Sequence, residues 1–597
     1  MDFRKHLSTL TARALERLGV QTGSSLTFEH PAEPSHGDYS TNVALQHFST
    51  SSGFTHPRAF AQALVVELVK QIDGDMVVSR LEVAGPGFIN FWLSPTALVD
   101  ELQLGIDQGE QYGSSDWGKG QRWLIEHTSP NPNKAMHLGH LRNNITGMAI
   151  ARLWEKVGVE VIRDCIDNNR GIAIAKLMWG YLKFAHKGTQ DIESIEYWFD
   201  HQDEWNTPED LGMRPDRFVD ELYVKASEDF KDPEVEQKVR QLVVDWENRE
   251  NKNWALWEKV LLYSYAGQEL TLKRLGNQYD KVWHEHEHYQ EGKDLVEKGL
   301  KSGIFVRAEN GAIVTSLEKY GIPDTIVRKA DGTSLYITQD LALTRLKKET
   351  FHPDRMFWTI GPEQSLAMQQ VFAVCEQLGI GKKEEFTHIA FGYMSIKGQG
   401  KMSSRAGNVV YIDELIDLAK TEVLAVMDTE RMSSEADREE VAEQVALGAV
   451  KYSILKVGRI TNTAFDFATS LSLDGDSGPY LQYTYARCTS VLEKSGITKP
   501  ELTRLPEFNE EELALLRWMY RYPEVVLSAA QNLEPSVIAT FIMSLAQRYN
   551  QFYHQHQILG SEVVPDQKAS RLLLTLATKK ILYNGLQLLG IKAPERM

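Results

Sequence analysis

The sequence predicts a multidomain protein of the α/β class, with a Rossmann-like parallel sheet in its middle. Three observations predict this. A strand-helix-strand pattern begins at Trp123, a mostly helical stretch rich in Trp, Glu and Asp interrupts it, and long amphipathic runs dominate after about Leu415. At 597 residues the chain also exceeds what one hydrophobic core usually supports. We therefore expect an α+β unit at 1–110, a Rossmann-like domain at 111–420 with a helical insertion at about 176–324, and an all-helical domain at 421–597.

The first unit begins with a helix, because Leu10, Ala14 and Leu18 recur at helical spacing. An alternating run at 80–83 and a second strand-like run at 87–93 follow it. A stretch at 109–120 containing Gly and Ser has the composition of a linker. Helices followed by paired strands indicate an α+β unit.

The middle of the chain predicts parallel strands joined by helices. Residues 123–126 are short and apolar, and the loop Ser129-Pro130-Asn131-Pro132 follows them. A helix is expected from His137, and 159–162 resembles the next strand. Further strands that can complete the sheet are expected at 335–337, 356–360 and 387–391. The amphipathic runs at 536–553 and 571–589 predict the terminal helical bundle.

Composition narrows the class of protein. With 42% hydrophobic residues and no apolar run near the ~20 residues that a membrane helix needs, we expect no membrane role. The three cysteines are scattered, which suggests neither a disulfide framework nor a thiolate zinc site and fits a reducing cytoplasm. The net charge of −17 opposes a general nucleic-acid surface, but a local basic face can bind phosphates on an acidic protein.

The segment His137-Leu138-Gly139-His140 is the first candidate site, because it stands where a strand passes into a helix. Exposed N–H groups and the positive end of the helix dipole favour a bound phosphate there. Gly139 lets a nucleotide approach the helix, and the two histidines can donate hydrogen bonds to a phosphate. Taken alone, such a pattern is better explained by capping or core histidines.

The second candidate is Gly400-Lys401-Met402-Ser403-Ser404-Arg405, a basic loop after a strand-like segment that could cover the β- and γ-phosphates of ATP. A basic surface turn is the alternative. The two segments together, in this order, resemble the nucleotide motifs of class I aminoacyl-tRNA synthetases.

Further segments are similar to arginyl-tRNA synthetases in particular, and they cover nearly the whole chain. They are 37–39, 85–90, 126–142, 331–340, 478–483 with Ala486 and Arg487, and 588–597. The resemblance is weakest in the insertion. It implies an ATP-dependent ligase that activates L-arginine as its adenylate and transfers it to the terminal ribose of tRNA(Arg), releasing AMP and pyrophosphate.

A substrate with a guanidinium and an α-ammonium group needs carboxylates at two places. Tyr336 and Asp340, four residues apart, would share one face of a helix beginning there, and Asp340 can take the guanidinium bidentately. The resemblance implies that Tyr336, Asp340 and Gln364 line the pocket for the arginine side chain, and that Glu126 and Asn131 hold the amino-acid end. A surface Tyr-Asp pair is the alternative for Tyr336 and Asp340 taken alone.

The sequence departs from the family pattern at two places. Ser404 stands where many class I enzymes have a second lysine in the phosphate loop, and Lys134 is the expected substitute. The second departure is the stretch Asp167-Asn168-Asn169-Arg170-Gly171. The family usually has Asn-Asp or Gly-Asp before a glycine of special backbone conformation. The resemblance otherwise implies that His137 and His140 stabilise the α-phosphate in the transition state, and that Lys401 and Lys134 stabilise the pyrophosphate.

The expected partners follow from the same resemblance. ATP would bind at His137, Gly139, His140 and Lys401 to Ser404, and Mg²⁺ would arrive with it, without dedicated protein carboxylates. Tyr480, Tyr483 and Arg487 are candidates for stacking on anticodon bases, and packing in the bundle is their alternative role. No resident metal site is expected, and we expect a cytoplasmic monomer.

Three other functions compete with this interpretation. The run His284-Glu285-His286-Glu287-His288 satisfies the His-Glu-x-x-His pattern of zinc proteases, although it lies in a charged stretch that favours a solvated segment. A non-catalytic RNA-binding relative is the second, and the intact His137, Lys401 and Asp340 speak against it. A cysteinyl-tRNA synthetase is the third, but it needs a Cys/His zinc site that three scattered cysteines do not readily form.

Overall fold

The computed structural model describes residues 2–21, 26–48, 53–188, 192–330, 335–398, 410–427, 434–502 and 504–597. The chain divides into two compact units. One comprises Met1–Gly113, Thr484–Glu524 and Phe541–Asn584, and the other comprises Ser114–Tyr483, Val525–Thr540 and Gly585–Met597. No helix in the parts of the chain that the structure describes is both long and apolar enough to cross a bilayer.

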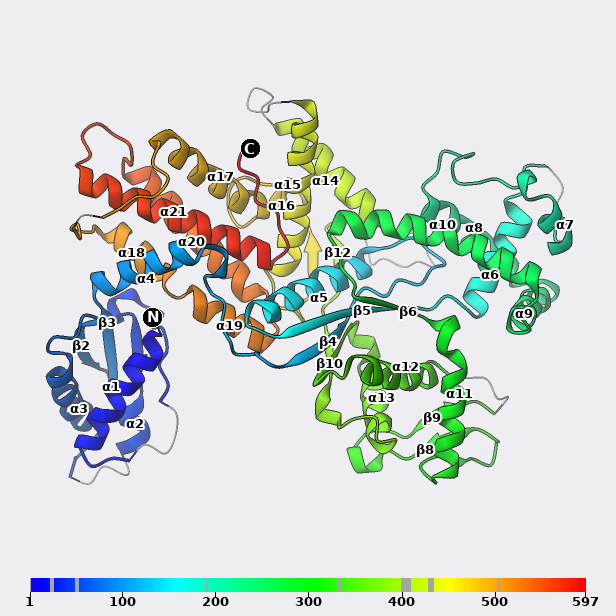
Figure 1. Cartoon of the computed structure of the whole chain (residues 1–597), viewed down its shortest axis with the longest axis horizontal. Coiled ribbons are helices and arrows are strands. Elements are labelled where there is room, and N and C mark those ends of the chain that lie inside the picture. Colours follow the sequence, from blue (N-terminus) through cyan, green and yellow to red (C-terminus); the bar gives the residue numbers. More distant parts are fainter. Residues whose placement is uncertain are drawn as a thin grey trace. The chain divides into compact units, whose positions relative to one another are not determined.

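The first unit begins with an α+β fold, as the sequence predicts (Figure 1). Its antiparallel sheet has the strand order β1-β3-β2. The strands are β1 (Tyr39–Thr41), β2 (Val78–Ala84) and β3 (Phe88–Leu93), and the helices are α1 (Phe3–Arg17), α2 (Val43–His47), α3 (Pro57–Ile72) and α4 (Pro95–Gln108). Helix α1 begins where the Asp2 carboxylate accepts a hydrogen bond from the amide of Lys5, and its buried stripe includes Leu7, Leu10 and Ala14.

The second unit contains a five-stranded sheet of order β11-β10-β4-β5-β6, in which every neighbouring pair is parallel. The strands are β4 (Arg122–Glu126), β5 (Glu160–Asp167), β6 (Lys281–His284), β10 (Arg355–Ile360) and β11 (Phe386–Ala390). The predicted α/β class with a parallel sheet is confirmed. The strands expected at 123–126, 159–162, 356–360 and 387–391 all belong to this sheet.

Two expectations for the sheet are wrong. Residues 335–337 do not form a strand, because α12 (Tyr336–Phe351) begins there and the Leu335 amide donates a hydrogen bond of 3.2 Å to Oγ1 of Thr338. Conversely, β6 lies within the stretch expected to be helical, and it pairs with β5. It is only four residues long and flanked by charged residues, so its sequence carries little of the apolar signal of a buried strand.

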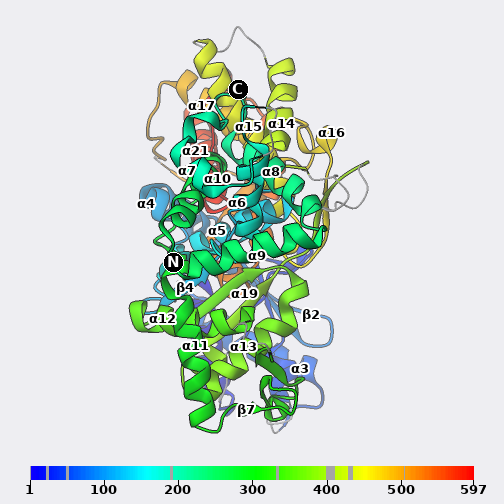
Figure 2. The same ribbon diagram turned by 90° about the vertical axis from the view of Figure 1, so that its right-hand side faces the viewer.

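The helices of the second unit surround the sheet or follow it (Figures 1 and 2). Helix α5 (Leu138–Lys156) joins β4 to β5, and α11 (Glu285–Lys301), α12 and α13 (Ser365–Gln377) flank the later strands. A small antiparallel sheet has the order β7-β8-β9. Its strands are β7 (Val306–Arg307), β8 (Ile313–Thr315) and β9 (Thr325–Arg328).

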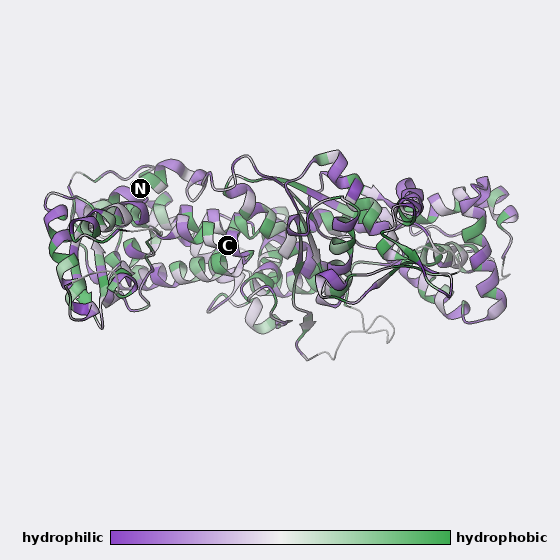
Figure 3. Cartoon of the chain, turned by 90° about the horizontal axis from the view of Figure 1, so that it is seen from below, coloured by the Kyte–Doolittle hydropathy of each residue, from purple (hydrophilic) through white to green (hydrophobic). Residues whose placement is uncertain are grey.

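A group of helices between β5 and β6 forms its own core. They are α6 (Ile172–Phe184), α7 (Ile195–Asp200), α8 (Pro215–Asp229), α9 (Pro233–Glu247) and α10 (Asn251–Leu275). Buried tryptophans fill the core, among them Trp179, Trp198, Trp205, Trp246 and Trp257. This core accounts for the high Trp content of the stretch. The Glu and Asp residues lie on the same helices, and Figure 3 shows hydrophobic and hydrophilic residues on the same helical ribbons.

The last part of the chain is almost entirely helical, as predicted. Its helices are α14 (Ile412–Val426), α15 (Glu435–Leu455), α16 (Phe467–Ser470), α17 (Gly478–Ser495), α18 (Glu510–Met519), α19 (Tyr522–Asn532), α20 (Ser536–Gln555) and α21 (Pro565–Leu588). One short parallel pair, β12 (Met394–Ile396) with β13 (Thr463–Phe465), lies in the second unit.

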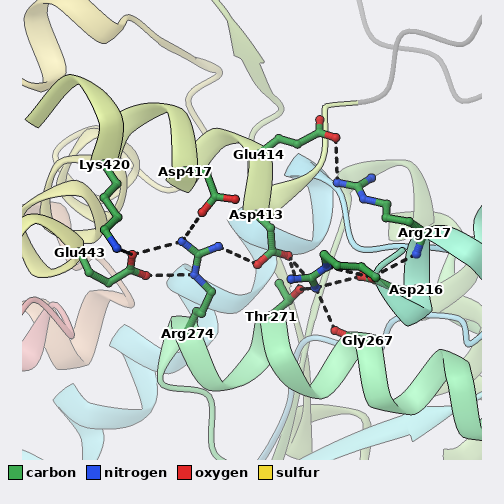
Figure 4. Close-up of polar contacts among 11 residues, drawn as sticks. Asp216, Arg217, Gly267, Thr271, Arg274, Asp413, Glu414, Asp417, Lys420 and Glu443 are labelled. Atoms are coloured by element: carbon green, nitrogen blue, oxygen red, sulfur yellow. Dashed lines mark hydrogen bonds and ion pairs between the residues drawn. The ribbon is translucent and has the colours of Figure 1, made fainter. Parts of the chain in front are cut away.

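Ion pairs fix the start of α14 to the helices between β5 and β6 (Figure 4). Asp413 is 5% exposed, and its carboxylate lies 2.9 Å from Nη1 of Arg274 and 3.2 Å from Nη2 of Arg214. The Arg274 guanidinium continues to Glu443 on α15 at 3.0 Å. Because a buried charge is costly unless it is paired, these contacts hold the first turn of α14 against Arg214 and Arg274.

Candidate functional site

The carboxyl ends of the parallel strands bring several predicted site residues to one edge of the sheet. Glu126 is the last residue of β4, and Asp164 is its partner in register on β5. The segment Pro362–Gln364 follows the end of β10 as a short 3-10 helix. In sheets of this kind ligands bind in the crevice beyond the carboxyl ends of the strands, and the predicted residues collect there.

His137 and His140 form a reciprocal cap at the start of α5. The Gly139 amide donates a hydrogen bond of 3.2 Å to Nδ1 of His137, and the His137 amide donates one of 3.2 Å to Nδ1 of His140. Their rings stack with centroids 4.1 Å apart. Since each Nδ1 accepts, each neutral ring carries its proton on Nε2, and neither Nε2 has a hydrogen bond to a described residue.

Burial keeps both of these histidines neutral. It lowers the pKa of His137 to about 4, with Lys134 adding to the effect, and it lowers the pKa of His140 well below its ordinary value. Gly139 is exposed between them, and a Cβ there would come within 3.0 Å of Cε1 of His137. The glycine therefore keeps the His137 ring in place and leaves the helix end open.

The loop between β4 and α5 places two further predicted residues. Oδ1 of Asn131 accepts a hydrogen bond of 3.2 Å from Nδ2 of Asn168, and the Asn131 side chain is exposed. The Lys134 ammonium is partly exposed and has no ion-pair partner among the described residues. Lys401, Met402, Ser403 and Ser404 lie outside the residues that the structure describes. So does the stretch 331–334.

The residues at the start of α14 lie beside the His137 cap. Tyr411 forms an antiparallel bridge with His137, and the Ile412 amide donates a hydrogen bond of 3.2 Å to the carbonyl of Met136. The Tyr411 hydroxyl donates to Asp220 on α8. The chain is thus fixed directly beside the His137 cap.

A buried ion cluster lies behind Glu126. Nζ of Lys347, on α12, is 2.6 Å from Oε2 of Glu126 and 2.8 Å from Oδ2 of Asp164. Nε1 of Trp283 donates to the same Asp164 oxygen at 2.9 Å. Lys347 was not predicted as a site residue. Its position seven residues after Asp340, and so on the same face of a helix, is the signal that could have found it.

Asp340 and Tyr336 lie on α12 as predicted, on one face of a helix that begins at Tyr336. The two side chains differ in environment. Tyr336 is 85% exposed, whereas the partly buried Asp340 carboxylate has no hydrogen bond or ion pair with any described residue. Burial raises the pKa of Asp340 to about 7, and the negative charge of Glu126 adds to this. Gln364 is exposed at the end of β10.

Glu285, which the sequence names only within the His-Glu-x-x-His run, also acts on Asp340. Burial raises the pKa of Asp340, and the charge of Glu285 adds to this increase. Glu285 lies at the start of α11 and pairs with Arg170 at 3.4 Å. Arg170 precedes Gly171, which has a φ of 83° and opens α6. The stretch that departs from the family pattern therefore connects the helical insertion to the edge of the sheet.

The run from His284 to His288 does not form the zinc-protease arrangement. His284 is the last residue of β6 rather than part of α11, and its Nδ1 is 2.6 Å from Asp167. Because His284 is not helical, it does not share a helix face with His288. The expectation of a solvated segment is also wrong, since His288 is only 4% exposed. Within the described ranges, no three His, Cys, Asp or Glu side chains gather closely enough to hold a metal ion.

The three candidates for RNA contact all lie on α17. Tyr480, Tyr483 and Arg487 are spaced so that they share one face of this helix. Nη1 of Arg487 donates a hydrogen bond of 2.5 Å to Oδ1 of Asn550, and its guanidinium lies over the ring of Tyr553. Arg487 therefore has a packing role in the bundle.

Three family models match the chain. The model for the catalytic domain of class I (R) tRNA synthetases matches residues 102–467. The DALR anticodon binding domain matches 481–597, and the arginyl tRNA synthetase N terminal domain matches 5–93.

Curated relatives and solved structures agree with these models. The chain is 32% identical to the arginine–tRNA ligase of Treponema denticola, covering 99% of this chain and 98% of the relative. It is 33% identical to that of Parabacteroides distasonis, with 86% of each chain covered. The fold resembles the arginyl-tRNA synthetase of Thermus thermophilus with a TM-score of 0.78 at 24% identity, covering 100% of both chains.

Proposed function

This chain belongs to the class I arginyl-tRNA synthetases, and on that premise we propose roles for the residues at the carboxyl edge of its sheet. The established activity is that of an ATP-dependent arginine–tRNA ligase. It joins L-arginine and ATP as an adenylate and transfers the arginyl group to tRNA(Arg).

In the first step the arginine carboxylate attacks the α-phosphorus of ATP in line, and pyrophosphate leaves. The Nε2–H groups of His137 and His140 donate hydrogen bonds to the α-phosphate oxygens as negative charge grows there. The Nδ1 hydrogen bonds support this role, because they fix the tautomer in which Nε2 is the donor. Gly139 gives the nucleotide access to the end of α5.

The pyrophosphate is neutralised by Lys134 and by Lys401, with Met402, Ser403 and Ser404 completing the ATP site. Lys134 is three residues from His137 and has no competing ion pair among the described side chains, which supports its use as the substitute for a loop lysine. Mg²⁺ enters with the phosphates of ATP. The described residues include no cluster of three acidic or histidine ligands that would hold it separately, and no step is assigned to it.

Arginine is recognised at both ends. The Asp340 carboxylate takes the guanidinium bidentately, with Tyr336 and Gln364 along the side chain, while Glu126 and Asn131 hold the amino-acid end. The observation that carries this assignment is the Asp340 carboxylate, partly buried and without a partner among the described residues. A buried carboxylate left unpaired by a smaller apolar amino acid is costly, so binding alone discriminates against such competitors.

Residues at 1–110 contact the tRNA, 111–420 perform the chemistry, and 421–597 read the anticodon. Tyr480 and Tyr483 stack on anticodon bases, and Arg487 orients that helix face. The protein works as a monomer in the cytoplasm. The single face shared by the three α17 residues supports their common role.

Charging assays with tRNA and each of the twenty amino acids test this function. We expect arginine alone to be charged. Charging of another amino acid would contradict the substrate, and folded protein that charges none would favour a non-catalytic RNA-binding protein.

A further inference from the structure

Lys347 is completely buried and holds two carboxylates from neighbouring strands. Its side chain and that of Asp164 are 0% exposed, and that of Glu126 is 7% exposed. Nζ contacts only one oxygen of each acid, Oε2 of Glu126 and Oδ2 of Asp164. A buried lysine ammonium would be costly without these two carboxylate partners.

The contacts of Glu126 divide its two oxygens. Oε2 receives the Lys347 ammonium at 2.6 Å, whereas the one hydrogen bond that Oε1 accepts from the described residues is 3.4 Å long and comes from the Ser129 hydroxyl. Ser129 in turn accepts from the Ile166 amide at 3.1 Å, so its oxygen is fixed by the sheet. One oxygen is therefore bound firmly from inside the protein, and the other is held weakly.

We propose that Lys347 is a positioning residue for arginine. It fixes Oε2 of Glu126 and so presents Oε1 to the α-ammonium of the substrate. This rests on the proposed role of Glu126 at the amino-acid end.

The charges of the cluster support this inference. Glu126, Asp164 and Asp340 contribute three negative charges when ionised and Lys347 one positive charge, so two negative charges remain. Arginine brings two positive groups to them, the guanidinium and the α-ammonium. Without Lys347, the adjacent carboxylates Glu126 and Asp164 would share a proton instead, and the Glu126 carboxyl would turn toward Asp164.

Among the described residues, charged or titratable groups from four elements face Lys347. They are Glu126 on β4, Asp164 on β5, Asp340 on α12 itself and His288 on α11. Burial lowers the pKa of His288, so it is neutral near pH 7. The two carboxylates together raise the pKa of Lys347, which stays charged throughout the useful pH range.

The first experiment measures charging kinetics of the full chain carrying Lys347→Met, which removes the charge but keeps most of the volume. We expect the KM for arginine to rise at least tenfold at pH 7.5, while the KM for ATP changes less than threefold. The KM for arginine of the variant should also fall more steeply than that of the wild type from pH 6.5 to 9, because the shared proton is then lost. Lys347→Arg should recover most of the loss.

The matched control is Lys348→Met. Lys348 is the next residue on α12, and it pairs with Glu385 rather than with the cluster. It should leave both KM values within twofold of the wild type. An unchanged KM for arginine in Lys347→Met, or an equal rise in both KM values, would overturn the inference.

Two arginine analogues separate positioning from general damage. Agmatine keeps the amino and guanidinium groups but lacks the carboxylate, and 5-guanidinopentanoate lacks the α-amino group. Lys347→Met should weaken inhibition by agmatine at least tenfold and leave inhibition by 5-guanidinopentanoate unchanged. Equal weakening of both would contradict a role through Glu126. If Lys347→Met does not fold, Lys347→Gln takes its place in the same comparison with the same expected pattern.

Glu126→Gln distinguishes this inference from the site assignment on which it rests. If Glu126→Gln leaves the KM for arginine unchanged, the proposed role of Glu126 fails, and the role of Lys347 fails with it. If Glu126→Gln raises that KM and Lys347→Met does not, only the inference about Lys347 fails.

Discussion

The main-chain amide of His137 donates a hydrogen bond of 3.2 Å to Nδ1 of His140. This one contact caps α5 and also fixes the tautomer of the second histidine. Since the ring cannot hold a proton on Nδ1, Nε2 must carry it, and Nε2 is the atom available to a phosphate. The capping role and the proposed catalytic role are thus performed by opposite sides of the same ring.

We expect His140→Ala to lower the kcat of arginine activation about 10²-fold, because it removes one donor to the developing charge, with little change in the KM for arginine. Pyrophosphate exchange in the presence of tRNA measures this. The control is His352→Asn, at an exposed position with a φ of 47° that Asn tolerates. A loss expressed only in the KM for arginine would speak against the assigned role.

Arginine binding should depend on pH through Asp340. Its pKa is raised to about 7, and only the ionised carboxylate pairs with a guanidinium. The KM for arginine should therefore rise as pH falls below about 7, approaching tenfold per pH unit. Asp340→Asn should raise the KM at every pH and abolish this dependence. A wild-type KM that is flat from pH 5.5 to 8 would show that Asp340 does not bind the guanidinium.

Protonation of the two histidines should not limit activity over the same range. Burial lowers the pKa of His137 to about 4, so this ring remains a neutral donor down to about pH 5, and burial also lowers the pKa of His140 well below its ordinary value. At saturating arginine, kcat should change little between pH 6 and 8. A kcat that falls with an apparent pKa between 6 and 7 would indicate that charged histidines are not tolerated and that their pKa values lie higher.

Lys134→Ala should lower kcat/KM for ATP about 10- to 100-fold, because the leaving pyrophosphate loses one charge-assisted hydrogen bond. Lys134→Arg should retain more activity than Lys134→Ala. Lys119→Ala, at an exposed residue paired with Asp116, is the control. An unchanged rate of pyrophosphate release would refute the substitution of Lys134 for a loop lysine while leaving the family assignment intact.

The buried Asp413 should be important for stability. Asp413→Ala removes the buried carboxylate that Arg214 and Arg274 share, although Arg214 keeps Asp216 and Arg274 keeps Glu443 as partners. We expect a loss of about 3 kcal/mol in the free energy of unfolding. Urea denaturation followed by circular dichroism measures it. Asp116→Ala, which breaks an exposed pair, should cost less than about 1 kcal/mol. Equal effects would mean that the network in Figure 4 contributes no more than a surface ion pair.

Much of the architecture could be predicted because local sequence and local structure agree. The apolar run at 123–126, the cap at His137 and the helical spacing after it specify β4 and α5 without distant contacts. The strand predicted at 335–337 is wrong. Leu, Tyr and Ile favour strands, but the hydrogen bond from the Leu335 amide to Thr338 starts a helix there. Strand β6 was missed because its place in the sheet depends on pairing with β5, more than 110 residues earlier.

The parallel sheet could be predicted from the sequence pattern, and the resemblance to the family supplied the two nucleotide segments and the residues expected to bind arginine. Only the tertiary structure decided their environment. It places Lys347 between Glu126 and Asp164, leaves Asp340 without a partner among the described residues, and turns His284 toward Asp167 and away from a zinc-like arrangement. The physical reason is that burial and charge pairing arise from residues far apart in the chain, and these two effects set the ionisation and orientation of each side chain.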